Sequence, residues 1–118
     1  MKTVLVVDDS AFMRMLLKEK LEKIGGVRVY EAANGGEAVK EYERLKPDLV
    51  LLDLVLPDIS GEAVLAAIRE TPSDTKVIMV TAVGQRLVMR RCEKLGISGY
   101  IIKPFDDAEL REAITQVL

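Results

Sequence analysis

The chain has 118 residues, of which 49% are hydrophobic and 31% are charged, a composition typical of one globular domain and not of a disordered segment. Its net charge of -2 argues against nucleic acid as a partner of this domain, and the absence of histidine excludes a Ser-His-Asp triad and histidine metal ligands. A single cysteine, no apolar run of about 20 residues and no export signal at the N-terminus predict a cytoplasmic protein that does not enter a membrane.

Five short apolar segments, taken in chain order, are predicted to be strands. They occupy residues 3–8, 27–32, 48–53, 76–81 and 99–103. Most of them are apolar at consecutive positions, which is typical of strands that are buried on both faces of a parallel sheet. We therefore expect helices on both sides of this sheet.

Helices are predicted between the strands. The first begins after Ser10 and stops at Gly25, because glycine commonly ends a helix. The second begins at Asn34, and Glu37 follows three residues later as in a variant of the capping box. Pro47 prevents this second helix from continuing, since proline has no backbone N–H to donate.

Three further helices complete the alternation. The third spans 60–70, the fourth ends at Gly96, and the fifth begins at Asp106 with Glu109 at a capping-box position. Regular alternation of strand and helix predicts an α/β fold, a doubly wound (βα)5 arrangement with five parallel strands in one domain over residues 1–118.

Four of the five predicted strands end in charged or hydroxyl-bearing side chains. They are Asp8 and Asp9 on the first strand, Asp53 on the third, Thr81 on the fourth and Lys103 on the fifth. The carboxyl ends of parallel strands share one edge of the sheet, where open α/β folds bind their ligands. We therefore expect these five residues to form one site.

The charges of this expected site require a cation. Three carboxylates and one ammonium group leave an excess of two negative charges, which one divalent ion would neutralise. Mg2+ prefers oxygen ligands and keeps bound waters that can face a phosphate. Asp8 and Asp9 are thus interpreted as a metal-holding pair. Asp53, alone on the third strand, is interpreted as a nucleophile toward phosphorus that forms an acyl phosphate.

Four motifs along the chain resemble the receiver domain of two-component response regulators. They are "VVDDS", "LLDLVLPDISG", "VTAVG" and "YIIKPF", which stand in the family's order and spacing over essentially all 118 residues. The resemblance implies the flavodoxin-like or CheY-like strand order 2-1-3-4-5, and it implies that Asp53 is the phosphoacceptor. Among receivers, "DDSAFMR" and "TAVGQ" are most similar to the chemotaxis type.

The resemblance also assigns the metal ligands. Asp9 and Asp53 would hold Mg2+, for which Mn2+ can substitute, together with the backbone carbonyl of Val55. Asp8 would act mainly through a metal-bound water.

The resemblance to receivers also assigns a phosphate-binding lysine and a pair of switch residues. Lys103 matches the phosphate-binding lysine, and its bond to Pro104 is expected to be cis. Thr81 and Tyr100 match the switch pair, in which the hydroxyl moves toward the phosphoryl group and the aromatic ring turns inward.

The resemblance implies a signalling domain and not a classical enzyme. A histidine kinase or a small acyl phosphate would donate the phosphoryl group, and a target protein would bind the surface of the fourth helix, fifth strand and fifth helix. Because the chain ends with the fifth helix, we expect a stand-alone chemotaxis-type regulator, or else a receiver excised from a longer transcription factor or phosphorelay protein. By the same resemblance, Val55 and Val83 would flank the approach of the hydrolytic water. Neither side chain can hydrogen-bond it, which predicts slow loss of the phosphoryl group or a separate phosphatase.

Some residues have two interpretations. Arg86, Arg90 and Lys94 recur every four residues, as a solvated basic face or as a docking stripe for an acidic partner. Phe12 and Met15 fall at the edge of the apolar stripe of the first helix or outside it, where they could meet a partner helix.

Asp58 is interpreted as a turn residue that brings negative charge to the start of the third helix, and Gly61 as a glycine needed for a turn or for close packing.

Two other functions are weighed against this one. A Mg2+-dependent phosphohydrolase of the haloacid-dehalogenase kind would carry a D-x-D motif after the first strand, whereas here the two acids are adjacent and the nucleophile is on the third strand. A flavodoxin-like FMN carrier would need a hydroxyl-rich phosphate loop where this chain has Asp8 and Asp9. Both interpretations fit the motifs less well.

Overall fold

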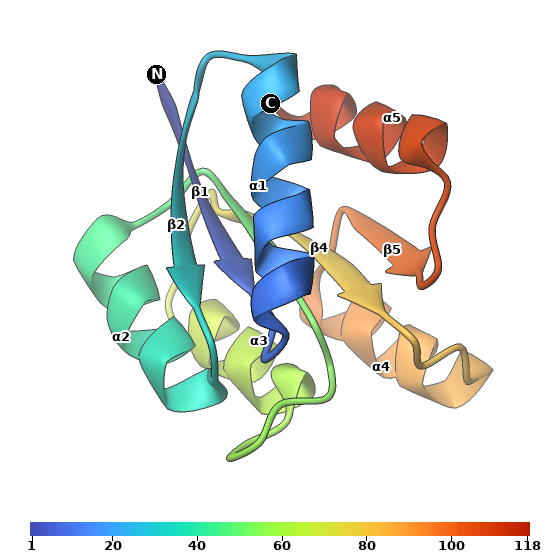
Figure 1. Ribbon diagram of the computed structural model, residues 1–118. Coiled ribbons are helices and arrows are strands. Elements are labelled where there is room, and N and C mark those ends of the chain that lie inside the picture. Colours follow the sequence, from blue (N-terminus) through green and yellow to red (C-terminus); the bar gives the residue numbers. More distant parts are fainter.

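A computed structural model describes all residues, 1–118, and its strands and helices alternate as predicted. The strands are β1 (Lys2–Val7), β2 (Val27–Ala32), β3 (Leu49–Leu52), β4 (Lys76–Thr81) and β5 (Gly99–Ile102). The helices are α1 (Ala11–Ile24), α2 (Gly35–Leu45), α3 (Gly61–Arg69), α4 (Arg86–Leu95) and α5 (Asp107–Val117). All neighbouring strands are parallel, in the order β2-β1-β3-β4-β5, which confirms the predicted fold and order (Figure 1).

Two apolar layers cover the sheet, because alternate residues of each strand point to opposite faces. On one face, Leu5 and Val7 of β1 pack with residues of α2, α3 and α4. On the other face, Val4 and Val6 pack with residues of α1 and α5. Figure 1 shows α1 and α5 on one side of the sheet and the other three helices across it. None of the helices is long and apolar enough to cross a membrane.

Most predicted helix ends are confirmed by their capping contacts. The Ser10 side chain accepts a hydrogen bond from the N–H of Met13 at the start of α1, and Gly25 ends that helix with a positive φ of 85°. The Asn34 side chain caps α2 by accepting from the N–H of Glu37. Glu37 in turn accepts from the side-chain amide of Asn34 and from the N–H of Ala33, and not from the N–H of Asn34 as in a standard capping box.

Two local predictions were wrong. Glu109 makes no capping hydrogen bond at α5, where Asp106 accepts from the N–H of Ala108 instead. Asp58 lies in the bend before α3, as expected of a turn residue, but its carboxylate serves α2 instead of α3: it accepts hydrogen bonds from the first two N–H groups of α2, those of Gly35 and Gly36. The loop between β3 and α3 reaches across to α2 only in the folded chain, so local spacing could not indicate this contact.

Candidate functional site

The acidic side chains stand one residue past their strands and are held there by the sheet itself. The N–H of Asp8 donates to the carbonyl of Ala32 at 3.2 Å, and the N–H of Asp53 donates to that of Val7 at 3.0 Å. On the other side, the N–H of Lys103 donates to the carbonyl of Thr81 at 2.8 Å. The hydrogen-bond ladder therefore fixes these backbones at one edge of the sheet, the lower edge in Figure 1.

Three carboxylates meet at this edge as predicted. Asp8, Asp9 and Asp53 each offer an oxygen atom, and these atoms lie within 4.8 Å of one another. Asp8 and Asp53 are buried, with exposed fractions of 1% and 6%, whereas Asp9 is exposed. Two buried anions and one exposed anion form a site that is open to solvent on one side, as a cation with retained waters needs.

Lys103 joins the two buried carboxylates. Its Nζ lies 2.6 Å from Asp8 Oδ2 and 2.9 Å from Asp53 Oδ2, and its bond to Pro104 is cis as expected. Burial alone would lower the pKa of Lys103, but the hydrogen bonds to Asp8 and Asp53 outweigh burial and raise that pKa above its ordinary value. The lysine is thus held in its charged form between the carboxylates.

The loop after β3 begins at Asp53 and is shaped by a glycine. A Cβ atom on Gly61 would lie 2.0 Å from the carbonyl oxygen of Asp53, so only glycine allows the start of α3 to approach this closely. The N–H of Gly61 donates to the carbonyl of Leu54 at 2.8 Å and closes the loop. Val55 lies on this loop as an exposed residue, and its N–H donates to Asp53 Oδ1 at 3.2 Å.

The proposed switch residues lie on neighbouring strands, and a shared loop residue connects them. Thr81 is fully buried, and its Oγ1 accepts a hydrogen bond from the N–H of Val83 at 3.4 Å. The half-buried ring of Tyr100 packs against the apolar layer next to α4, and its hydroxyl donates to the carbonyl of Val83. Burial raises the pKa of Tyr100, with smaller contributions from Cys92 and Asp53. Thr81 and Tyr100 therefore both contact the backbone of one residue in the β4–α4 loop.

Sequence reasoning missed three residues that support the site. The guanidinium group of Arg14 donates to the backbone carbonyl of Asp8 at 2.7 Å and pairs with Glu31 at 3.0 Å. The N–H of Ser10 donates to Asp8 Oδ1 at 2.9 Å. The only sequence signal for Arg14 was its place in the segment "DDSAFMR", which indicated a family resemblance and no contact.

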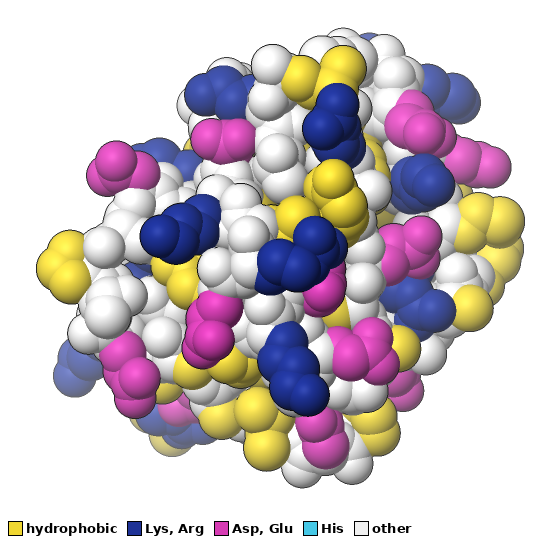
Figure 2. Space-filling model, turned by 90° about the vertical axis from the view of Figure 1, so that its left-hand side faces the viewer, with side chains coloured by type: hydrophobic (Ala, Val, Ile, Leu, Met, Phe, Trp, Pro, Cys, Tyr) yellow, Lys and Arg dark blue, Asp and Glu magenta, His cyan; other side chains and the backbone are white.

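The other surface residues named from the sequence make none of these contacts. Phe12 and Met15 are exposed on α1, with exposed fractions of 65% and 50%, as the helical wheel predicted. The basic residues of α4 named above are exposed and form no ion pair, as expected of a solvated face. On the face shown in Figure 2, basic and acidic side chains are interspersed.

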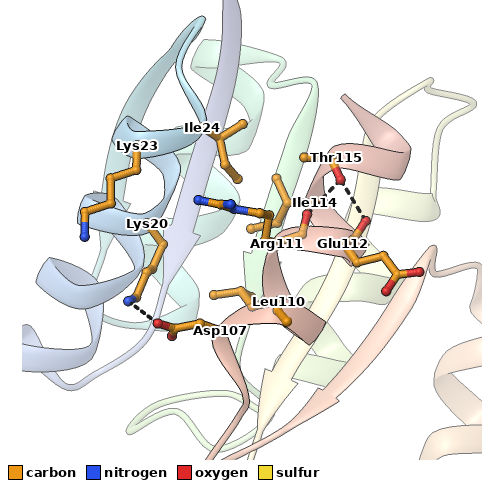
Figure 3. Close-up of a pocket in the computed structure, with 10 residues that line it drawn as sticks. Lys20, Lys23, Ile24, Asp107, Leu110, Arg111, Glu112, Ile114 and Thr115 are labelled. Carbon is orange, nitrogen blue, oxygen red and sulfur yellow. Dashed lines mark hydrogen bonds and ion pairs between the residues drawn. The ribbon is translucent and has the colours of Figure 1, made fainter.

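A hollow lies between α1 and α5, away from the acidic edge. Lys20, Lys23 and Arg111 line it together with apolar side chains such as Ile114, and Lys20 pairs with Asp107 at 2.7 Å (Figure 3). None of the residues that line it belongs to the acidic edge. The hollow is therefore separate from the site at the strand ends.

Comparison with known proteins decides the family. The family described as "Response regulator receiver domain" matches residues 4–115. The chain belongs to this family. It is 40% identical to the chemotaxis protein CheY of Thermotoga maritima, over 98% of this chain and 97% of that protein. It is 44% identical to the chemotaxis protein CheY of Halobacterium salinarum, over 99% of this chain and 97% of that protein.

A solved structure extends the comparison to the fold. The CheX-CheY-BeF3-Mg2+ complex of Borrelia burgdorferi contains a chain that matches this receiver with a TM-score of 0.91 and 32% identity, over 98% of this chain and 88% of that one. Receiver domains bind Mg2+ at an acidic pocket, and the donor set of Asp8, Asp9 and Asp53 fits such an ion in this chain. As a receiver, the chain is a signalling domain of two-component systems and not a classical enzyme.

Proposed function

We propose that this receiver is switched by phosphorylation of Asp53. The observation that supports this proposal is the bridge from Lys103 to Asp8 and Asp53 beside the exposed carboxylate of Asp9. One ammonium group and three carboxylates leave an excess of two negative charges, and an incoming phosphoryl group adds more. The site therefore suits a divalent cation and a phosphoryl group that bind together.

The residues have distinct tasks in this proposal. Asp9, Asp53 and the backbone carbonyl of Val55 would hold Mg2+, and Asp8 would act through a metal-bound water. Mg2+ supplies positive charge to the phosphoryl oxygens when it is bound. An oxygen of Asp53 attacks phosphorus, so that a P–O bond forms while the P–N bond to the donor histidine breaks. The histidine nitrogen keeps the bonding electrons and takes up a proton.

Lys103 and Thr81 hold the product. Lys103 exchanges one of its carboxylate contacts for a phosphoryl oxygen, since its Nζ already lies 2.9 Å from Asp53. The buried hydroxyl of Thr81 turns toward the phosphoryl group as a hydrogen-bond donor. Its present contact is with the N–H of Val83, whose carbonyl accepts from Tyr100, so a movement of Thr81 reaches the β4–α4 loop and the aromatic ring.

Receiver domains take phosphoryl groups from histidine kinases and bind targets. We propose that this receiver is of the chemotaxis type, with a histidine kinase as donor and a target protein on the α4–β5–α5 surface. The similarity to CheY proteins of two organisms over nearly their whole length supports assignment to the chemotaxis type. A separate phosphatase is a further proposed partner, because Val55 and Val83 offer no polar side chain to a hydrolytic water.

The test is direct phosphorylation of the purified protein. Incubation with Mg2+ and acetyl phosphate is expected to add one phosphoryl group, which intact mass spectrometry measures. Asp53→Asn has nearly the same shape without the nucleophilic carboxylate and is expected to stay unmodified. Equal modification of wild type and Asp53→Asn would show that the acceptor is another residue, and no modification of wild type in the presence of Mg2+ would contradict the proposed function itself.

A further inference from the structure

The loop between β3 and α3 contains the proposed phosphoacceptor Asp53 and the Val55 carbonyl, yet its own backbone holds it weakly. Residues 55–59 make no backbone–backbone hydrogen bond with any part of the chain. The side chains of Val55 and Ile59 are exposed. Something outside the loop backbone must therefore hold its tip in one place.

Asp58 provides that contact. Its Oδ1 accepts from the N–H of Gly35 and its Oδ2 from the N–H of Gly36, both at 2.8 Å. These are the only hydrogen bonds that join residues 55–59 to another element, and they reach 23 and 22 residues back along the chain. The tip of the loop is thus tied to the start of α2.

The start of α2 is well suited to hold a carboxylate. The first N–H groups of a helix have no partner within the helix, and the helix dipole places partial positive charge there. Asn34 accepts only from the third of these groups, that of Glu37, so the first two remain for Asp58. Hydrogen bonds to an ionised acceptor are stronger than those between neutral groups, and these two N–H groups lower the pKa of Asp58.

Side-chain packing supports the same contact. A Cβ atom on Gly35 would lie 2.3 Å from Cγ1 of Ile59, so the absence of a side chain at this first helical position lets Ile59 rest on α2. At the other end, the N–H of Gly61 closes the loop onto the carbonyl of Leu54. The loop is therefore fixed at its base by Gly61 and at its tip by Asp58 and Ile59.

We propose that Asp58 is a positioning residue for the phosphoacceptor site: by tying the loop to α2, it keeps the Val55 carbonyl in place for the metal. This inference rests on the proposed function for the identity of the ligand, Mg2+. It assigns Asp58 no contact with Mg2+ or with the phosphoryl group. Residues that orient a metal ligand from outside the first coordination sphere typically change metal affinity by about 10- to 100-fold when mutated. Because Asp58 acts through three residues of backbone, we expect the lower end of that range.

The experiment compares Asp58→Ala with Asp58→Asn. Alanine removes both acceptors, whereas asparagine removes the charge and keeps one acceptor oxygen for the helix N–H groups. Asp74→Ala serves as a control. It removes an exposed carboxylate in the loop before β4 that forms no hydrogen bond or ion pair. Circular dichroism establishes that each variant is folded at the temperature of measurement.

The first measurement is Mg2+ affinity by titration calorimetry at low and at high salt. Asp58→Ala is expected to weaken Mg2+ binding about tenfold and Asp58→Asn less, while Asp74→Ala stays near wild type. The loss of one negative charge also weakens cation binding, but that effect is the same for both variants and is screened at 1 M salt, where the Debye length is about 3 Å. The difference between alanine and asparagine is therefore expected to persist at high salt.

The second measurement needs no metal. Amide hydrogen exchange of residues 53–61 in metal-free protein is expected to be faster in Asp58→Ala than in wild type, with asparagine between them. Equal Mg2+ affinity and equal exchange in all variants would overturn the proposal, and so would affinity losses that are identical for alanine and asparagine and vanish at high salt. If wild type itself fails to bind Mg2+, the proposed function fails, and the exchange data still decide whether Asp58 orders the loop.

Discussion

Replacing Lys103 by methionine is expected to destabilise the metal-free protein by about 3 kcal/mol, because removing one partner of a buried ion pair leaves its counterion uncompensated. The ammonium group contacts Asp8 at 2.6 Å and Asp53 at 2.9 Å, and the side chains of these two aspartates have exposed fractions of only 2% and 8%. Methionine keeps the length of the side chain, so the change removes charge and hydrogen bonds more than packing.

The expected loss of unfolding free energy determines how far the urea midpoint shifts. Breaking buried pairs typically costs about 3–5 kcal/mol, and the lower value applies here since Lys103 keeps 17% of its side chain exposed. With a urea slope of about 1.5 kcal/mol/M for a small domain, the unfolding midpoint is expected to fall by about 2 M. Mg2+ is expected to reduce the difference in urea midpoint between the variant and wild type, because a divalent ion neutralises the same carboxylates and stabilises the state to which it binds.

The chain offers a matched control for the urea experiment. Lys20 contacts Asp107 at 2.7 Å, a distance like that at the site, but the side chain of Asp107 is 70% exposed. Solvent screens such surface pairs, so Lys20→Met is expected to leave the midpoint almost unchanged. If Lys103→Met and Lys20→Met unfold at the same urea concentration without Mg2+, the claim that Lys103 neutralises buried charge is wrong.

Three further outcomes are expected. In Mg2+ titrations without a phosphodonor, Asp9→Ala should lose most of the binding and Asp8→Ala less; equal affinity in Asp9→Ala and wild type would remove Asp9 from the ligand set. The double change Val55→Asn with Val83→Glu should speed loss of the phosphoryl group by about one or two decades, since each decade is only about 1.4 kcal/mol of barrier; an unchanged decay rate would mean that water access is controlled elsewhere. Because the pKa of Tyr100 is raised in the folded protein, the contribution of this shift to stability is complete below the ordinary tyrosine pKa and is lost as pH rises through the folded value. Urea midpoints of Tyr100→Phe should therefore lack this loss at alkaline pH. Identical pH profiles of the variant and wild type would contradict the raised pKa of Tyr100.

The sequence alone indicated which elements form and which residues end the strands. Capping at Ser10 and Asn34 and the stop at Gly25 depend on contacts within a few residues, so local spacing was sufficient to predict them. Asp8 and Asp53 follow runs that are apolar at consecutive positions, and parallel strands bring such ends to one edge. The strand order itself was expected from the resemblance to receivers, since periodicity does not specify which strands are neighbours.

Only the tertiary structure decided how these side chains meet. Lys103 contacts Asp8 across 95 residues and Asp53 across 50, and which carboxylates it reaches depends on the register of β4 and β5 against the rest of the sheet. Asp58 was assigned to the wrong helix from sequence, because the nearest helix start lies just after it whereas its partners lie 22 and 23 residues before it. Hydrogen bonds within a turn are governed by local backbone angles, but those between distant segments form only when packing of the two apolar layers has placed the segments side by side.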